Sequence, residues 1–108
     1  MSFKEFVKYP FLSLKNLPKE FQVYVKGYRE METKFGLGHY LIVQLVQTAK
    51  NKKSLEGLLK ISATTGASIA SHVPQLEHLR DLETYLVSFA FDPEVKTIMC
   101  TEVKEWGQ

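Results

Sequence analysis

The chain has 108 residues and a mass of 12.4 kDa, which suits one domain and excludes a multidomain enzyme. Hydrophobic residues make up 44% of it and charged residues 24%, a balance that indicates a globular chain and excludes a disordered or low-complexity one. The formal net charge of +2 neither requires nor excludes an anionic partner.

The start of the chain and its cysteine content indicate an intracellular protein. No apolar run approaches the roughly 18 residues of a membrane span, and Lys4 and Glu5 interrupt the stretch where a signal peptide would be apolar. The single cysteine, Cys100, can form neither an internal disulfide nor a cysteine metal site. We therefore expect an intracellular protein, of the cytoplasm or nucleus, that is not secreted and has no membrane partner.

Residues 1–18 are expected to form an N-terminal arm of short helical turns, followed by one domain over residues 19–108. The apolar residues of the arm recur at nearly helical spacing, but Pro10 interrupts the pattern and Pro18 ends it. The arm is too short for a core of its own, so it must bury its apolar side chains on the domain or on another chain. This predicts a homodimer formed through the arm.

Residues 21–33 are predicted to form a half-buried strand, because apolar and polar residues alternate over its first half. Gly27 lies inside the strand, where a glycine often marks a bulge or a sharp bend. After a turn at residues 34–38, the apolar stretch at 39–47 predicts a second strand, so the two make a hairpin. The alternation puts four residues on the solvent side of the first strand: Gln22, Tyr24, Lys26 and Tyr28.

A short third strand is predicted at residues 57–62. The apolar positions of residues 67–82 keep helical spacing, with Pro74 marking a helix start or kink, and strands are predicted at 84–91 and 97–104. This order predicts a mainly β fold with one helix, a five-stranded OB-like barrel that follows the arm. The competing folds are an SH3-like barrel and an open antiparallel sheet with a helix on one face.

Positive charge is concentrated in the first half of the chain. Through Lys60, ten lysines and Arg29 face five acidic residues, whereas the remainder has three basic and seven acidic residues. This division favours one electropositive face if the first strands lie side by side. A solvated mixture of surface charges is the alternative.

Aromatic and cationic residues alternate along the first strand and the turn after it. Such a mixture suits single-stranded nucleic acid, because bases stack on aromatic rings at roughly 1 to 3 kcal/mol each while lysine and arginine neutralise phosphates. For the tyrosines, cross-strand packing is the alternative. The predicted nucleic-acid-binding residues in this region are Tyr24, Lys26, Tyr28, Arg29, Lys34, Phe35 and His39.

Two further regions extend the predicted site. Lys52 and Lys53, between the second and third strands, add positive charge where a nucleic-acid strand could pass, unless this is an ordinary solvated loop. Trp106 is either another stacking residue or a lid over the core. We include Lys52, Lys53 and Trp106 among the predicted binding residues.

The sequence offers little for catalysis or for metal and cofactor binding. Its histidines, His39, His72 and His78, lack the spacing of a paired site, and Cys100 lies in an apolar strand without a nucleophile signature. The glycines at 36 and 38 fall between two strands, so a turn is expected there and not a phosphate loop. We expect no enzyme activity, no cofactor, no metal and no small-molecule substrate.

The stretch Phe21-Gln-Val-Tyr-Val-Lys-Gly-Tyr-Arg-Glu-Met-Glu-Thr-Lys-Phe-Gly36, followed by Tyr40-Leu-Ile-Val, resembles the first hairpin of small single-stranded-DNA-binding OB-fold proteins from viruses and mobile elements. In these proteins a curled strand ends in a Thr-Lys-Phe/Tyr-Gly turn. The resemblance implies a viral-type replication protein that binds DNA. By position it implies a ligand-facing surface with Tyr24, Lys26, Tyr28 and Arg29, and an edge with Lys34 and Phe35.

The expected function is sequence-tolerant binding of single-stranded nucleic acid, with DNA preferred, through aromatic stacking and phosphate neutralisation. The alternative is a protein-interaction or assembly module, in which the arm docks on a neighbouring subunit and the tyrosines form a protein interface. The lysine-rich connection at residues 50–53 favours the first function, because the core of a protein interface tends to exclude lysine.

Overall fold

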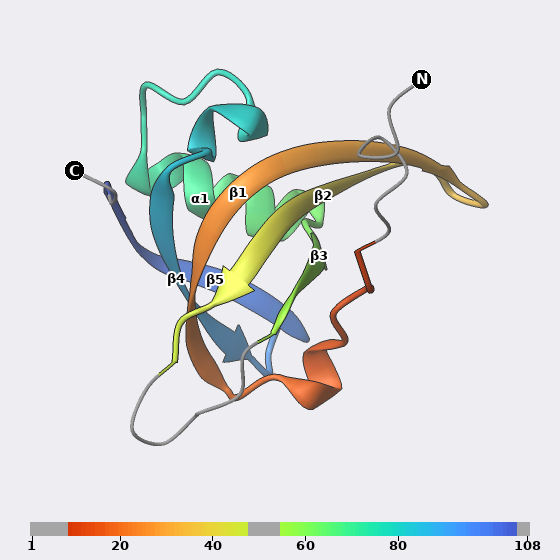
Figure 1. The fold of residues 1–108 in the computed structure, drawn as a ribbon, viewed down its shortest axis with the longest axis horizontal. Coiled ribbons are helices and arrows are strands. Elements are labelled where there is room, and N and C mark those ends of the chain that lie inside the picture. The colour runs from red at the N-terminus through yellow and green to blue at the C-terminus, as the bar shows by residue number, and fades with distance from the viewer. Residues whose placement is uncertain (1–8, 48–54, 106–108) are drawn as a thin grey trace.

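The computed structural model describes residues 9–47 and 55–105, whose strands form one antiparallel sheet in the order β3-β2-β1-β4-β5 (Figure 1). In these ranges α1 (Ala63–His72) is the one α-helix, and β3 and β5 are the two sheet edges, unpaired with each other. The predicted mainly β fold with five strands and one helix is therefore confirmed. The strands are β1 (Glu20–Thr33), β2 (Gly36–Leu45), β3 (Glu56–Lys60), β4 (Tyr85–Asp92) and β5 (Thr97–Glu105).

The sheet curves around a core made by its inward-facing side chains. Phe21, Val23 and Val25 of β1 are buried on this side, as their alternation predicts. Each such aliphatic or aromatic side chain contributes roughly 1.5 to 3 kcal/mol when it is fully buried. Strands β2 to β5, helix α1 and the segment after this helix supply the other large buried side chains. These include Leu41, Leu45, Leu59, Ile69, Leu82, Phe89 and Ile98.

A bulge interrupts β1 near its middle. Val25 lies opposite Val43, but Gly27 lies opposite Ile42, so Lys26 is an extra residue without a counterpart on β2. Gly27 packs closely on its neighbour, since a Cβ there would lie 3.3 Å from Cδ1 of Ile42. The bulge that the glycine indicated is present, and it reverses the facing pattern of every β1 residue that follows.

The reversal separates the two tyrosines of β1. Tyr24 lies opposite Gln44 on the outer side of the sheet, whereas Tyr28 lies opposite the fully buried Leu41 on the inner side. The expectation that Tyr24 and Tyr28 share the solvent face is therefore wrong. Counting by twos holds only along an uninterrupted strand, and one inserted residue moves all later side chains to the other face.

The helix begins earlier and ends sooner than the predicted residues 67–82. Ser62 caps its N-terminus by accepting a hydrogen bond from the Thr65 amide at 3.2 Å. It ends at His72, because Pro74 has no amide hydrogen and restricts the backbone of the residue before it. The apolar residues beyond the proline pack on the core from a loop and from a short 3-10 helix, η3 (Leu79–Leu82).

Helix α1 packs along the free edge of β5 and bonds to its backbone. The Thr65 hydroxyl donates a hydrogen bond to the Ile98 carbonyl at 2.7 Å, and the Cys100 amide donates one to the Ser68 hydroxyl at 2.9 Å. Cys100 is buried here, and this burial raises the pKa of its thiol. The two hydroxyls thus satisfy β5 backbone groups that a sixth strand would otherwise pair.

The arm, over residues 9–17, lies along the free edge of β3 in the same chain (Figure 1). The Leu12 amide donates to the Leu58 carbonyl at 2.9 Å, and the Leu58 amide donates to the Pro10 carbonyl at 2.8 Å. Gly57 permits this approach, because a Cβ at that position would collide with the Pro10 carbonyl oxygen. The arm then makes one short 3-10 turn, η2 (Leu14–Asn16), before β1 begins.

Candidate functional site

The outer sides of β1, β2 and β3 bring two cations to either side of a tyrosine. Arg29 lies opposite Tyr40, and Tyr40 lies opposite Lys60, so the three side chains form one row across the sheet. Tyr40 is only 7% exposed, whereas Lys60 is exposed and Arg29 half-buried. We define the outer face as this row with its neighbours on the three strands and the arm: Tyr9, Phe11, Tyr24, Lys26, Arg29, Tyr40, Ile42 and Lys60.

The arm adds two aromatic rings to the outer face. The guanidinium carbon of Arg29 lies 5.7 Å from the centre of the Tyr9 ring, a cation–π contact worth about 0.5 to 1 kcal/mol at an exposed site. The Phe11 ring meets the Tyr40 ring edge-on, with the ring centres 5.5 Å apart. Phe11 is itself 64% exposed, so its ring remains open to a stacking ligand.

Gly38 explains why Tyr40 is buried on the outer side of the sheet. The tyrosine ring lies over this glycine, and a Cβ there would be 3.0 Å from Cε1 of Tyr40. Gly38 lies within β2 and Gly36 begins that strand, so the predicted turn at residues 34–38 is shorter in the structure. The second glycine serves the packing of an aromatic ring.

Lys26 is held by an exposed ion pair. Its Nζ lies 2.6 Å from Oε2 of Glu56, and the two side chains are 43% and 40% exposed. Exposed pairs of this kind stabilise a fold by about 0 to 1 kcal/mol. A phosphate oxygen can therefore replace the Glu56 carboxylate at little cost.

The β1–β2 hairpin ends in a tight turn that presents Lys34 and Phe35 to solvent. The Thr33 hydroxyl donates to the Gly36 carbonyl at 2.7 Å and accepts from the Phe35 amide at 3.2 Å. Gly36 has a φ of +107°, a conformation that favours glycine. Phe35 is 95% exposed, so the turn holds an aromatic ring in the open.

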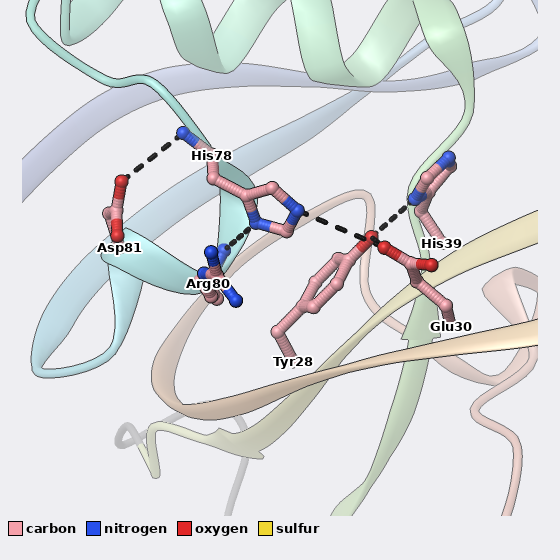
Figure 2. Close-up of polar contacts among 6 residues, drawn as sticks. All are labelled: Tyr28, Glu30, His39, His78, Arg80 and Asp81. Atoms are coloured by element: carbon pink, nitrogen blue, oxygen red, sulfur yellow. Dashed lines mark hydrogen bonds and ion pairs between the residues drawn. The ribbon is translucent and has the colours of Figure 1, made fainter.

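On the inner side of the same hairpin, Tyr28 is the centre of a polar cluster (Figure 2). Its hydroxyl donates to Oε1 of Glu30 at 2.9 Å and lies in hydrogen-bond contact with Nδ1 of His39. The His78 ring, which precedes η3, meets the Tyr28 ring edge-on with centres 4.7 Å apart. Tyr28 and His39 thus have partners on the inner side and do not belong to the outer face.

The environment of Tyr28 keeps its phenol neutral. Burial first, and then the hydrogen bond and charge of Glu30, raise the pKa of Tyr28 to about 12, against a smaller opposing effect of Arg80. A phenol has one proton, and here it is donated to Glu30. The neutral phenol therefore keeps the hydrogen that Glu30 accepts, and its oxygen also contacts Nδ1 of His39.

His78 connects this cluster to η3. Its Nδ1 accepts a hydrogen bond from the Arg80 amide at 3.1 Å, and its own amide donates to the Asp81 carboxylate at 3.2 Å (Figure 2). The other ring nitrogen, Nε2, lies 3.8 Å from Oε1 of Glu30. The inner cluster therefore links the hairpin to η3, and its polar groups already have hydrogen-bond or ion-pair partners.

The structure divides the predicted binding residues into three groups. Tyr24, Lys26 and Arg29 lie on the outer face, Lys34 and Phe35 lie at the hairpin tip, and Tyr28 and His39 lie in the inner cluster. The remaining predicted residues fall outside the part of the chain that the structure describes: Lys52, Lys53 and Trp106.

The predicted site left out five residues of the outer face: Tyr9, Phe11, Tyr40, Ile42 and Lys60. Tyr9 and Phe11 belong to the arm, which meets β3 through a contact far away in the sequence. Tyr40 and Lys60 join Arg29 only through strand register. The one available signal was Gly27. A residue inserted at a bulge there would have placed Arg29, and not Tyr28, on the outer face.

The chain matches no family model, and neither curated proteins nor solved structures are significantly similar to it. Over residues 9–47 and 55–105, His, Cys, Asp and Glu side chains form no group of three able to hold a metal ion. In the same ranges no helix has the length and apolar character needed to cross a membrane.

Proposed function

We propose that the chain binds single-stranded nucleic acid on its outer face, without catalysis and without strict sequence preference. The row Arg29–Tyr40–Lys60 carries this proposal, because it sets two cations across three adjacent strands beside the exposed ring of Phe11. Flexible strands are bound by this combination of backbone neutralisation and ring stacking. DNA is the preferred ligand in this proposal.

We further propose that the sheet is an OB-like, partly open barrel. Its strand order and the position of α1 between β3 and β4 support this, and such barrels use the face of their second and third strands and the first hairpin loop for oligonucleotides. The gap between β3 and β5 is occupied by α1 and the arm instead of a closing pair of strands. The outer face includes the corresponding strands, β2 and β3.

In the proposed complex, bases stack on Tyr24 and Phe11, and Phe35 at the hairpin tip takes a further base. Phosphates follow Arg29 and Lys60, and Lys26 exchanges Glu56 for a phosphate. The inner cluster, which carries the Glu30 carboxylate, takes no part. Because each phosphate contact releases a counterion, the affinity falls steeply as salt rises.

The test is fluorescence anisotropy of a labelled oligothymidine titrated with the protein at low and moderate salt, with a duplex of equal length as competitor. Arg29→Gln with Lys60→Gln should weaken binding about tenfold or more and reduce the salt slope by about 1.4, since each phosphate contact of a single strand contributes about 0.7. The matched control is Arg80→Gln with Lys96→Gln, which removes the same charge from η3 and the β4–β5 turn.

Equal losses in the two double variants would show that net charge, and not the outer face, governs binding. No binding by the unmodified chain at low salt would refute the function itself. Preference for the duplex would also contradict it, since stacking needs unpaired bases.

A further inference from the structure

Two apolar features lie at opposite ends of β1. At its far end the hairpin tip exposes 95% of Phe35 and 54% of Leu37, and at its near end Phe21 borders an open pocket. The turn holds the Phe35 ring in the open, and burying this ring against an apolar partner would be favourable. The turn is ordered by both hydrogen bonds of the Thr33 hydroxyl.

The pocket is an apolar socket of about 340 Å³ with two lysines in its wall. A cavity of roughly 150 Å³ already admits benzene, so a phenyl ring fits with room for a neighbouring side chain. Phe91 and Leu14 in its wall are 39% and 37% exposed, so the apolar lining is open from outside. The lining residues are Leu14, Lys15, Leu17, Pro18, Lys19, Phe21, Phe91 and Ile98.

We propose that the hairpin tip of one copy seats in the socket of a second copy. Phe35 enters the apolar space, and Leu37 covers its mouth. The charges agree with this pairing, because Glu32 lies opposite Leu37 on the tip and is exposed, whereas Lys15 and Lys19 line the socket. The rigid turn lowers the conformational entropy lost on docking.

This contact joins two different surfaces, so it closes only where two copies exchange tips reciprocally or where several copies form a ring. β1 is 14 residues long and paired with β2 from Val23 to Thr33, which keeps the tip of a chain away from its own socket. Copies therefore associate as reciprocal dimers, or head to tail into rings or open chains. The area is small, so the association is weak and appears only at high protein concentration.

The experiment is sedimentation velocity over a range of protein concentrations, without nucleic acid. We expect the mean mass of the unmodified chain to rise with concentration. Phe35→Ala removes the knob and Leu14→Glu places a carboxylate in the socket, where it excludes a ring and repels Glu32; each variant alone should lose at least tenfold in self-association. Val95→Ala, which trims another exposed apolar side chain, should behave as the unmodified chain.

Mixing the two variants gives the decisive result. The Phe35→Ala copy retains a socket and the Leu14→Glu copy retains a knob, so an equimolar mixture should form a one-to-one dimer and nothing larger. A monomer at every concentration, or unchanged association in Phe35→Ala, would overturn the proposal. Because no nucleic acid is present, these results are independent of whether the outer face binds oligonucleotides.

Discussion

The two faces of the β1–β2 hairpin come from the same strands but have opposite character. The outer face has Arg29 beside the half-buried ring of Tyr9, with partners that a ligand can replace, whereas the inner side has Glu30 and Glu32 with Tyr28 at the centre of a polar cluster. Neighbouring residues of opposite charge are thus sorted to opposite sides. The difference shows that one inserted residue decides which part of a mixed-charge strand forms a basic surface.

The contacts on the two faces also differ in how exchangeable they are. The Lys26–Glu56 pair on the outer face is exposed and stabilises the fold little. Tyr28 instead lies among Glu30, His39 and His78, which engage its hydroxyl and its ring. Substitutions on the outer face should therefore change binding, and substitutions in the inner cluster should change stability.

Deleting Lys26 should break the division between the faces. Without the extra residue the alternation of β1 becomes continuous, so Arg29 turns inward towards the core while Tyr28 and Glu30 turn outward. A buried, unpaired guanidinium costs about 3 to 5 kcal/mol, which we expect as lost free energy of unfolding in urea. Lys26→Ala, which keeps the residue count, should lose less than about 1 kcal/mol; equal effects would contradict this account.

Tyr24→Ala tests the expectation that substitutions on the outer face change binding and not stability. Loss of one stacking ring should weaken oligothymidine binding by roughly 5- to 150-fold, equivalent to about 1 to 3 kcal/mol. The urea midpoint should change little, because Tyr24 is only half-buried on the outer side. Anisotropy and urea unfolding should be measured on the same sample. A destabilised chain with unchanged affinity would contradict the prediction.

Tyr28→Phe should show the complementary behaviour. It removes the hydroxyl shared by Glu30 and His39, so we expect a loss of about 1 kcal/mol in stability and no change in oligothymidine affinity. Reduced binding with unchanged stability would contradict this prediction and indicate that Tyr28 contacts the ligand. Tyr85→Phe, which removes a hydroxyl from an exposed contact with Glu105, is the matched control.

Tyr28→Phe should also change how the free energy of unfolding depends on pH in alkaline solution. The pKa of Tyr28 is raised from 10.0 to about 12, so its neutral form stabilises the fold fully below pH 10, and this contribution is lost as the pH rises towards 12. Unfolding free energies measured across this window should fall in the unmodified chain and in Tyr85→Phe. In Tyr28→Phe this part of the decline should be absent.

The sequence was sufficient to predict the strands and the presence of a helix, but it contained little about how these elements pack against one another. Alternation located β1 because its first half is uninterrupted, and a short apolar run located β2. The helix was placed too late, since the apolar spacing continues past Pro74 although the helix itself stops at His72. Side chains beyond a proline can reach the core from a loop as well as from a helix.

The candidate site was only partly predictable for a different reason. Arg29, Lys34 and Phe35 are neighbours in sequence, so local pattern was sufficient to single them out. Lys60 and Phe11 reach the outer face, beside Arg29, through strand register and through the edge contact of the arm. These are long-range properties of the fold, which no local spacing contains.

The treatment of the two sheet edges has a consequence for solubility. An uncovered edge strand is a template on which other chains add strands and aggregate. Here the hydroxyls of α1 occupy the edge of β5, and the arm occupies the edge of β3. Proteolytic loss of residues before Leu17 would expose the β3 backbone, so precipitation by strand addition would precede any loss of the core.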